Sequence, residues 1–132
     1  MLALLYGGLF GLVMAVLSIR VPMRRFATGI AWGDGGDPEL ATRIRVFGNF
    51  IEYVPFILLL MLMIEMAGGA AWFLHAAGLI LLAMRLLHAV SLRASGAVRA
   101  HRIGRGVAAA MTWLVLLACA VYAVALGLPV IG

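Results

Sequence analysis

The chain has 132 residues, of which 66% are hydrophobic and 11% are charged, and its formal net charge is +5. A soluble domain of this length cannot hide so much apolar surface in one core, so the composition excludes an ordinary water-soluble protein. The ten basic residues are all arginines and gather around two connections between apolar segments, a pattern that argues against a nucleic-acid-binding surface. The chain is therefore expected to lie in a bilayer.

Four apolar segments follow one another along the chain. Each is close to the ~20 residues that a helix needs to cross the hydrocarbon core, and none has the alternation of a transmembrane strand. Because lipid permits only helices and closed barrels to span it, the sequence predicts an all-α membrane protein, a four-transmembrane-helix bundle forming one domain over residues 1–132. The predicted helices are 2–20, 45–67, 70–92 and 106–128.

The first apolar segment is expected to be a retained helix. No basic residue precedes it and arginines follow it, unlike the pattern of a cleaved signal peptide. Pro22 is expected to end this helix, and the glycine-rich stretch 33–36 predicts a loop. Asp37 is a favoured N-cap and proline is tolerated at the first helical position, so the second helix is expected to begin near Pro38, before it enters the membrane.

The arginines predict the orientation of the bundle. Nine of the ten lie in or beside the connections between the first and second and between the third and fourth helices; the tenth is Arg85. In a four-helix membrane protein these two connections emerge on the same side, which the positive-inside rule makes cytoplasmic. We therefore expect a multi-pass membrane protein, surrounded by lipid, with both termini on the side opposite the cytoplasm.

Polar residues at the start of the second apolar segment are the strongest functional signal. An ionisable group inside a membrane costs about 3 kcal/mol, so it is retained mainly where it pairs, lines a wet cavity or binds a ligand. Arg45, Asn49 and Glu52 have the i, i+4, i+7 spacing of one helix face. Arg85 and His88 lie one turn apart near the same end of the third helix. We interpret these residues as a ligand site, the alternatives being a helix-terminal ion pair, a snorkelling arginine and a structural histidine.

Other polar and reactive residues carry less functional information. The histidines and the single cysteine have none of the spacings of a metal site, so no metal is expected. Cys119, in the middle of an apolar segment, is expected to be a packing residue. Glu65 and His75 lie toward the opposite side of the membrane and are expected to make interfacial or capping contacts.

The second-helix pattern Arg45, Asn49, Glu52 and Pro55, followed by Arg85 late in the third helix, resembles the MAPEG family. These are the membrane-associated proteins in eicosanoid and glutathione metabolism. The resemblance covers most of the chain. The turn at residues 33–36 and the Arg85-Leu-Leu-His88 end of the third helix are more similar to the small bacterial inner-membrane branch than to the eukaryotic synthases. Together with the orientation predicted above, this resemblance implies a protein of the bacterial inner membrane with both termini in the periplasm.

The resemblance implies a homotrimer whose active sites lie at subunit interfaces and open toward the cytoplasm, where glutathione binds as co-substrate and its thiol is activated. A hydrophobic small molecule would arrive from the bilayer as the second substrate of a transferase or peroxidase. The positions that match glutathione contacts of the family are Arg45, Asn49, Glu52 and Arg85, with His88 as a further candidate. The thiol-activating arginine would lie near the start of the fourth helix, where Arg99 and Arg102 are the candidates.

Two departures from the family pattern leave other functions open. Phe47 and Gly48 stand where many glutathione-using members have a basic or polar residue, and Leu92 replaces a frequent tyrosine. The alternative is a non-catalytic accessory or assembly subunit of a larger membrane complex. A third and less favoured hypothesis is a small proton-coupled exporter with Glu52 as its proton site.

Overall fold

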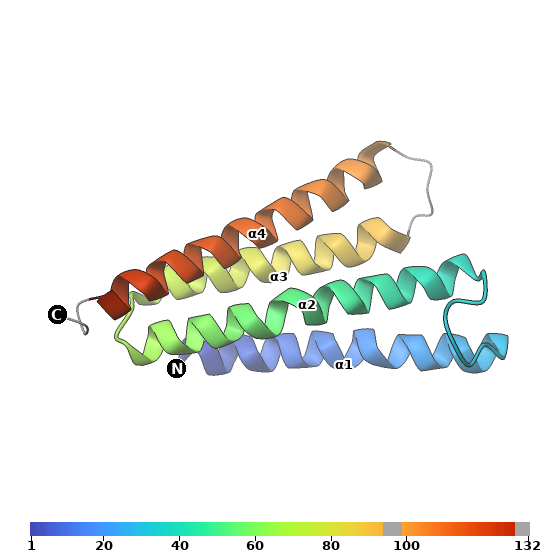
Figure 1. Ribbon diagram of the computed structural model, residues 1–132, viewed down its shortest axis with the longest axis horizontal. Helices are drawn as coiled ribbons and strands as arrows, with labels where there is room; N and C mark the ends of the chain where they lie inside the picture. Colours follow the sequence, from blue (N-terminus) through green and yellow to red (C-terminus); the bar gives the residue numbers. More distant parts are fainter. Residues whose placement is uncertain (94–98, 129–132) are drawn as a thin grey trace.

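The computed structural model describes the backbone of residues 1–93 and 99–128, and the side chains of residues 1–89, 103–104 and 106–128. Within these ranges the chain forms α1 (Leu2–Thr28), α2 (Pro38–Met66), α3 (Ala71–Arg93) and α4 (Arg99–Gly127). The helices lie side by side and alternate in direction, so α1 begins and α4 ends at the same end of the bundle (Figure 1). All four are long and apolar enough to cross a membrane, which confirms the predicted four-transmembrane-helix bundle.

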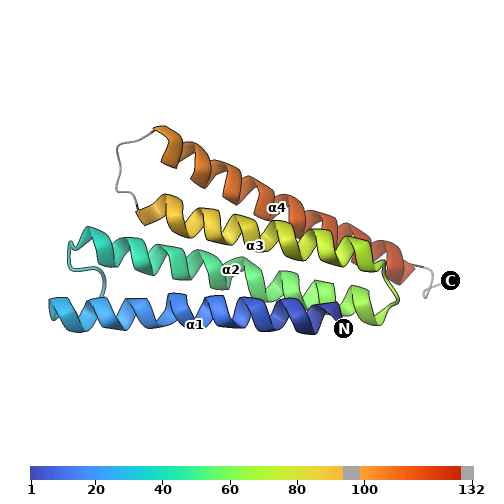
Figure 2. The same cartoon turned by 180° about the vertical axis from the view of Figure 1, so that it is seen from behind.

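Helices α2 and α3 occupy the centre of the bundle. Each of them packs against all three other helices, whereas in the described part of the chain α1 and α4 pack only against α2 and α3. Seen from both sides, α4 diverges from α1 and α2 toward the end where α4 begins (Figures 1 and 2). Polar side chains on the inward face of α2 are therefore within reach of the other helices.

Helix α1 is longer than the sequence predicts. It continues through Pro22 and ends before Gly29, whose φ of 68° places it in the left-handed conformation typical of a helix C-cap. A proline removes one backbone hydrogen bond, a loss that a membrane helix tolerates when neighbouring groups hold the segment. Here Arg24, beyond the proline, forms ion pairs with Asp37 at 2.7 Å and Glu39 at 3.0 Å. These tertiary contacts hold the extension, and the predicted end at Pro22 is wrong.

The local sequence predicts the start of α2 correctly but not the start of α4. The side chain of Asp37 accepts a hydrogen bond from the backbone N–H of Leu40 at 2.7 Å, and Pro38 takes the first helical position, as predicted. In contrast, α4 begins at Arg99 instead of the predicted residue 106, and it includes Gly104 and Gly106. A glycine inside a helix costs only about 1 kcal/mol, which is too little to end it.

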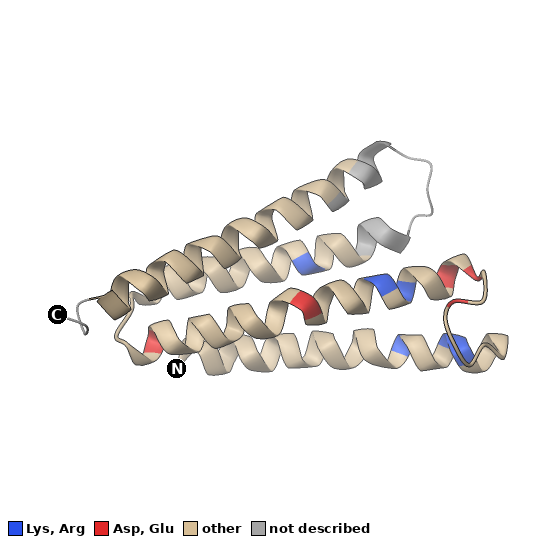
Figure 3. Ribbon diagram, viewed as in Figure 1, with Lys and Arg blue, Asp and Glu red and all other residues tan. Residues whose placement is uncertain are grey.

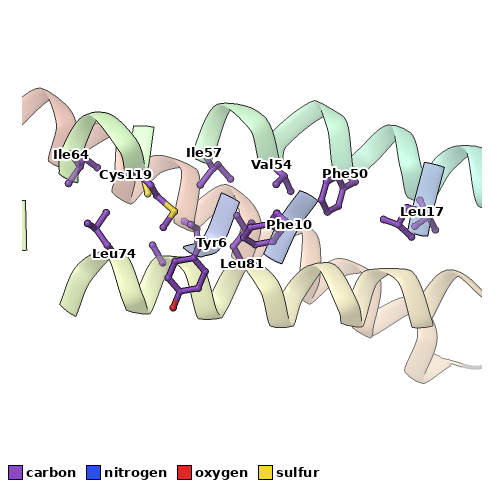
Figure 4. Close-up of a cluster of buried hydrophobic side chains, with 14 residues drawn as sticks. Tyr6, Phe10, Leu17, Phe50, Val54, Ile57, Ile64, Leu74, Leu81 and Cys119 are labelled. Carbon is purple, nitrogen blue, oxygen red and sulfur yellow. The ribbon is translucent and has the colours of Figure 1, made fainter. Parts of the chain in front are cut away.

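The core lies where α1, α2 and α3 meet, with α4 closing one side. Figure 4 shows side chains from all four helices pointing into one apolar cluster. Phe10, Ile57 and Leu81 are almost completely buried in it. Cys119 of α4 is fully buried in the same cluster, as expected for a packing residue.

The end of the bundle opposite the arginines is held by hydrogen bonds between helices. Glu65 of α2 accepts hydrogen bonds from the backbone N–H groups of Leu2 and Ala3, which have no acceptor within their own helix at its first turn. The Tyr6 hydroxyl lies 3.1 Å from His75 Nδ1 and donates to the His75 carbonyl at 3.2 Å. The predicted capping contact is therefore confirmed for Glu65, whereas His75 forms a contact between α3 and α1.

Replacing Gly78 with alanine is expected to destabilise the bundle. The Tyr6 ring lies so close to Gly78 that an added Cβ would be 2.5 Å from its carbon atoms. Overpacking of this kind costs about 1–3 kcal/mol, so the free energy of unfolding should fall in Gly78→Ala. Thermal unfolding in detergent would measure the change. Gly8→Ala is the control, because its Cβ meets no atom within 4 Å, and equal stability of the two variants would contradict the predicted clash.

The Asp37 cap is expected to make stability depend on acid pH. The pKa of Asp37 lies below its ordinary value because Arg24 donates to its carboxylate, with a second donation from the Leu40 backbone. A lowered folded-state pKa means that this stabilisation is complete above the unfolded pKa of about 3.9 and is lost as the pH falls through the folded-state pKa. The thermal midpoints of the wild type and Asp37→Asn should therefore converge in acid.

Scans of the thermal midpoint between about pH 7 and about pH 3 would measure this convergence. Asp34→Asn removes an acid from the same loop without touching Arg24, and it serves as the control. A gap between wild type and Asp37→Asn that stays constant with pH would contradict the prediction.

Candidate functional site

A buried arginine joins three helices inside the bundle. Arg85 of α3 is only 3% exposed. It donates to Asn49 Oδ1 of α2 at 2.5 Å and to the Thr112 hydroxyl of α4, which in turn donates to the Ala108 carbonyl at 2.7 Å. The planar guanidinium suits this task because its donors point in fixed and different directions. Arg85 therefore braces the side of α2 that carries the predicted site.

The guanidinium of Arg85 donates to neutral acceptors, and one of its donors has no partner. Within the described ranges no carboxylate forms an ion pair with it, and its buried Nε has no hydrogen-bond partner. Leaving a buried donor unsatisfied costs about 1–3 kcal/mol. The buried Nε–H of Arg85 therefore lowers the stability that the other four hydrogen bonds of this guanidinium within these ranges provide.

The structure separates the three residues that were predicted to share one face of α2, namely Arg45, Asn49 and Glu52. Asn49 is half-buried and turned toward Arg85, so these two predicted residues are brought together. Arg45 and Glu52 are exposed on the outside of α2, and in the described part of the chain no ion pair or hydrogen bond involves either side chain. The single chain thus presents a cation and an anion on either side of an anchored amide.

The exposed face of α2 continues as an apolar seam beyond Glu52. Residues 45, 52, 59 and 66 recur at intervals of seven, as do Phe56 and Met63, and all of them are exposed. A seven-residue repeat is the spacing by which one helix receives another along its length. The seam and the two charged residues therefore belong to one surface that a further helix could cover.

The remaining predicted site residues differ in what can be said of them. His88 is buried one turn from Arg85 and has an interaction of its own, so it is not a free base. Arg99 and Arg102 lie in the first turn of α4, at the arginine-rich end, but their side chains fall outside the described residues. Leu92 falls there as well. Direct contact of Arg85 with glutathione remains a prediction, since its side chain is buried in the single chain.

Thr112 is the polar residue that the sequence analysis missed. It is fully buried and supplies the α4 partner of Arg85. The only signal in the sequence is a single threonine within the long apolar segment of α4. A threonine hydroxyl commonly bonds the carbonyl four residues earlier in its own helix, so the pattern does not reveal a partner on α3.

Two adjoining pockets lie on the α1 side of the bundle. One, of about 600 Å³, is at the end where the α1–α2 loop lies and is bordered by Arg20, Arg24 and Arg43. The other, of about 380 Å³, runs between α1 and α3 and is bordered by Arg85. Figure 3 shows the basic residues of α1 and α2 gathered toward the loop end. The sequence placed these arginines at one side of the membrane but did not reveal the pockets.

Residues 3–125 match the family model described as the MAPEG family. The chain belongs to the MAPEG family. This MAPEG chain is 42% identical over 88 residues to the inner membrane protein YecN of Escherichia coli strain K12, a match that covers 67% of each protein. The inner membrane protein YecN of E. coli O6:H1 strain CFT073 matches with the same identity and coverage. No solved structure matches the chain.

Removing the Thr112 hydroxyl is expected to destabilise the brace around Arg85. Thr112→Val keeps the volume but leaves a donor of Arg85 unsatisfied, at a cost of about 1–3 kcal/mol. Thr112→Ser keeps the hydroxyl and should be affected less. Thermal unfolding of both variants in the same detergent would measure the difference, and equal losses of stability would show that the hydrogen bond to Arg85 contributes little.

Proposed function

We propose that this MAPEG protein is a glutathione transferase or peroxidase of the inner membrane, with glutathione bound beside α2 where a second copy of the chain covers Arg45 and Glu52. The observation that carries the proposal is the exposure of both charged side chains on the outer face of a helix long and apolar enough to span the membrane. Each would cost about 2.5–3.5 kcal/mol if it faced lipid at depth. A covering subunit and a charged ligand would remove that cost.

The charges of the site complement those of glutathione. The tripeptide carries two carboxylates and one ammonium group at neutral pH. Arg45 and an arginine at the start of α4 suit the carboxylates, and Glu52 suits the ammonium. Arg45 and Glu52 are seven residues apart, about 10 Å along the helix, so one small peptide-like ligand can contact both.

Asn49 and Arg85 would serve this site as a pair. Asn49 lies between the two charged residues, and its Oδ1 accepts from Arg85. An amide whose oxygen is engaged in this way directs its NH₂ donors elsewhere. Arg85 is thus a positioning residue that acts through Asn49, and Asn49 is the recognition group that donates to a ligand carbonyl or carboxylate.

The thiol would be activated by an arginine at the start of α4, Arg99 or Arg102. The start of α4 lies at the same end of the bundle as the α1–α2 loop (Figure 1). A guanidinium that lowers the pKa of the glutathione thiol by two units would stabilise the thiolate by about 2.7 kcal/mol. The thiolate then attacks a hydrophobic electrophile, or reduces a hydroperoxide, that enters from the bilayer.

The proposed assembly is a homotrimer with its arginine-rich end in the cytoplasm. The positive-inside rule supports this orientation, and the name of the relative YecN places that protein in the inner membrane. The exposed seven-residue seam of α2 supports contact between copies, since such a seam accepts a parallel or antiparallel helix.

A non-catalytic accessory subunit is the second candidate. It is favoured by the fact that Asn49, Arg85 and Thr112 form hydrogen bonds with one another inside one chain, as a purely structural brace would. In that case the exposed face of α2 would bind a different subunit of a larger membrane complex.

Glutathione binding to the purified protein in detergent tests the proposal. At a hundred times the dissociation constant, a single site should raise the free energy of unfolding by about 2.7 kcal/mol, seen as a shift in the thermal midpoint. Arg45→Ala and Glu52→Gln should lose the shift. Arg25→Gln is the matched control, because Arg25 is at the same end of the bundle but bonds the carbonyls of Ile30 and Ala31.

A glutathione analogue with both carboxylates blocked should give no shift. Activity with a hydrophobic electrophile or a lipid hydroperoxide would then separate the enzyme from a binding protein. No shift with glutathione in the millimolar range would reject the proposed site and favour the accessory subunit.

A further inference from the structure

The two pockets on the α1 side form one continuous groove. They share the bordering residues Leu17, Arg20 and Ala89, so one leads directly into the other. The remaining border of the inner pocket is Leu12, Val13, Val16, Arg85 and Leu86; that of the outer pocket is Arg24, Pro38, Glu39, Thr42, Arg43 and Val46. The groove is therefore apolar along most of its length and strongly basic at one end.

The apolar part of the groove opens sideways, toward the surrounding bilayer. Leu12 is 70% exposed, Val16 60% and Leu86 50%, although all three border the inner pocket. From Leu12 to Arg20 the groove follows α1 for eight residues, which is about 12 Å. Half of the hydrocarbon core of a bilayer is about 15 Å thick, so the apolar part extends through most of one leaflet.

The basic end carries more positive than negative charge. Three arginines, Arg20, Arg24 and Arg43, face two carboxylates, those of Asp37 and Glu39, which leaves an excess of one positive charge. Both carboxylates are already paired with arginines, and Glu39 is shared by Arg24 and Arg43. An anionic group therefore fits this end better than a group that carries its own ammonium.

We propose that this groove binds one anionic phospholipid from the leaflet at the arginine-rich end of the bundle. Its phosphate lies against Arg20, Arg24 and Arg43, and one acyl chain follows α1 past Val16 toward Leu12. The site is separate from the exposed face of α2 and does not depend on glutathione binding.

The test compares phosphatidylglycerol with phosphatidylcholine of the same acyl chains, added to the delipidated full-length protein and followed by native mass spectrometry. The wild type should retain one phosphatidylglycerol per chain, with an apparent affinity about tenfold above that for phosphatidylcholine. Arg20→Gln should remove this preference, and Val16→Trp should block retention by filling the groove.

The matched controls are Arg25→Gln and Val121→Trp. Val121 of α4 is 60% exposed, the same fraction as Val16, but it does not border the groove. Both controls should retain phosphatidylglycerol as the wild type does. If Val16→Trp does not fold, Leu12→Trp replaces it, because Leu12 lies farther along the same groove.

Three results would overturn the proposal. Equal retention of both lipids by all variants would mean that only bulk lipid is bound. If inorganic phosphate alone stabilised the protein as much as phosphatidylglycerol does, and Val16→Trp did not change this effect, the groove would be an anion site that binds no acyl chain. A change of oligomeric mass in Val16→Trp, with lipid retention unaltered, would mean that another copy of the chain covers the groove.

Discussion

Inside a bilayer a polar group has no water to bond, so it must find its partner in the protein or in a ligand. This constraint explains how the helices are joined. Arg85 reaches Asn49 on α2 and Thr112 on α4, and at the opposite end Glu65 reaches the first turn of α1. Apolar packing also contributes, as in the close fit of the Tyr6 ring against Gly78. Packing and the hydrogen bonds between helices together determine which faces meet.

The same constraint separates structural polar groups from functional ones. Asn49 and Thr112 form hydrogen bonds with Arg85, and Arg24 forms ion pairs with two acids at the start of α2. Arg45 and Glu52 have no such partner within the described ranges. Real proteins tolerate such exceptions mainly at functional sites. The glutathione site that we propose would account for both residues.

Arg85 connects the two surfaces for which functions are proposed. On one side it holds Asn49 between the exposed charges of α2, and on the other it borders the groove between α1 and α3.

The sequence by itself determined the fold class, the approximate spans and the position of the arginines, because length, hydropathy and charge near membrane helices act locally. It also predicted the Asp37 cap, since an N-cap is made within one turn. It could not show that α1 passes through Pro22, because the ion pairs of Arg24 that hold the extension are made with α2. Only the tertiary structure paired Arg85 with Thr112 and turned Glu52 outward. The reason is that packing between helices decides which side chains of a helix are buried and which are exposed.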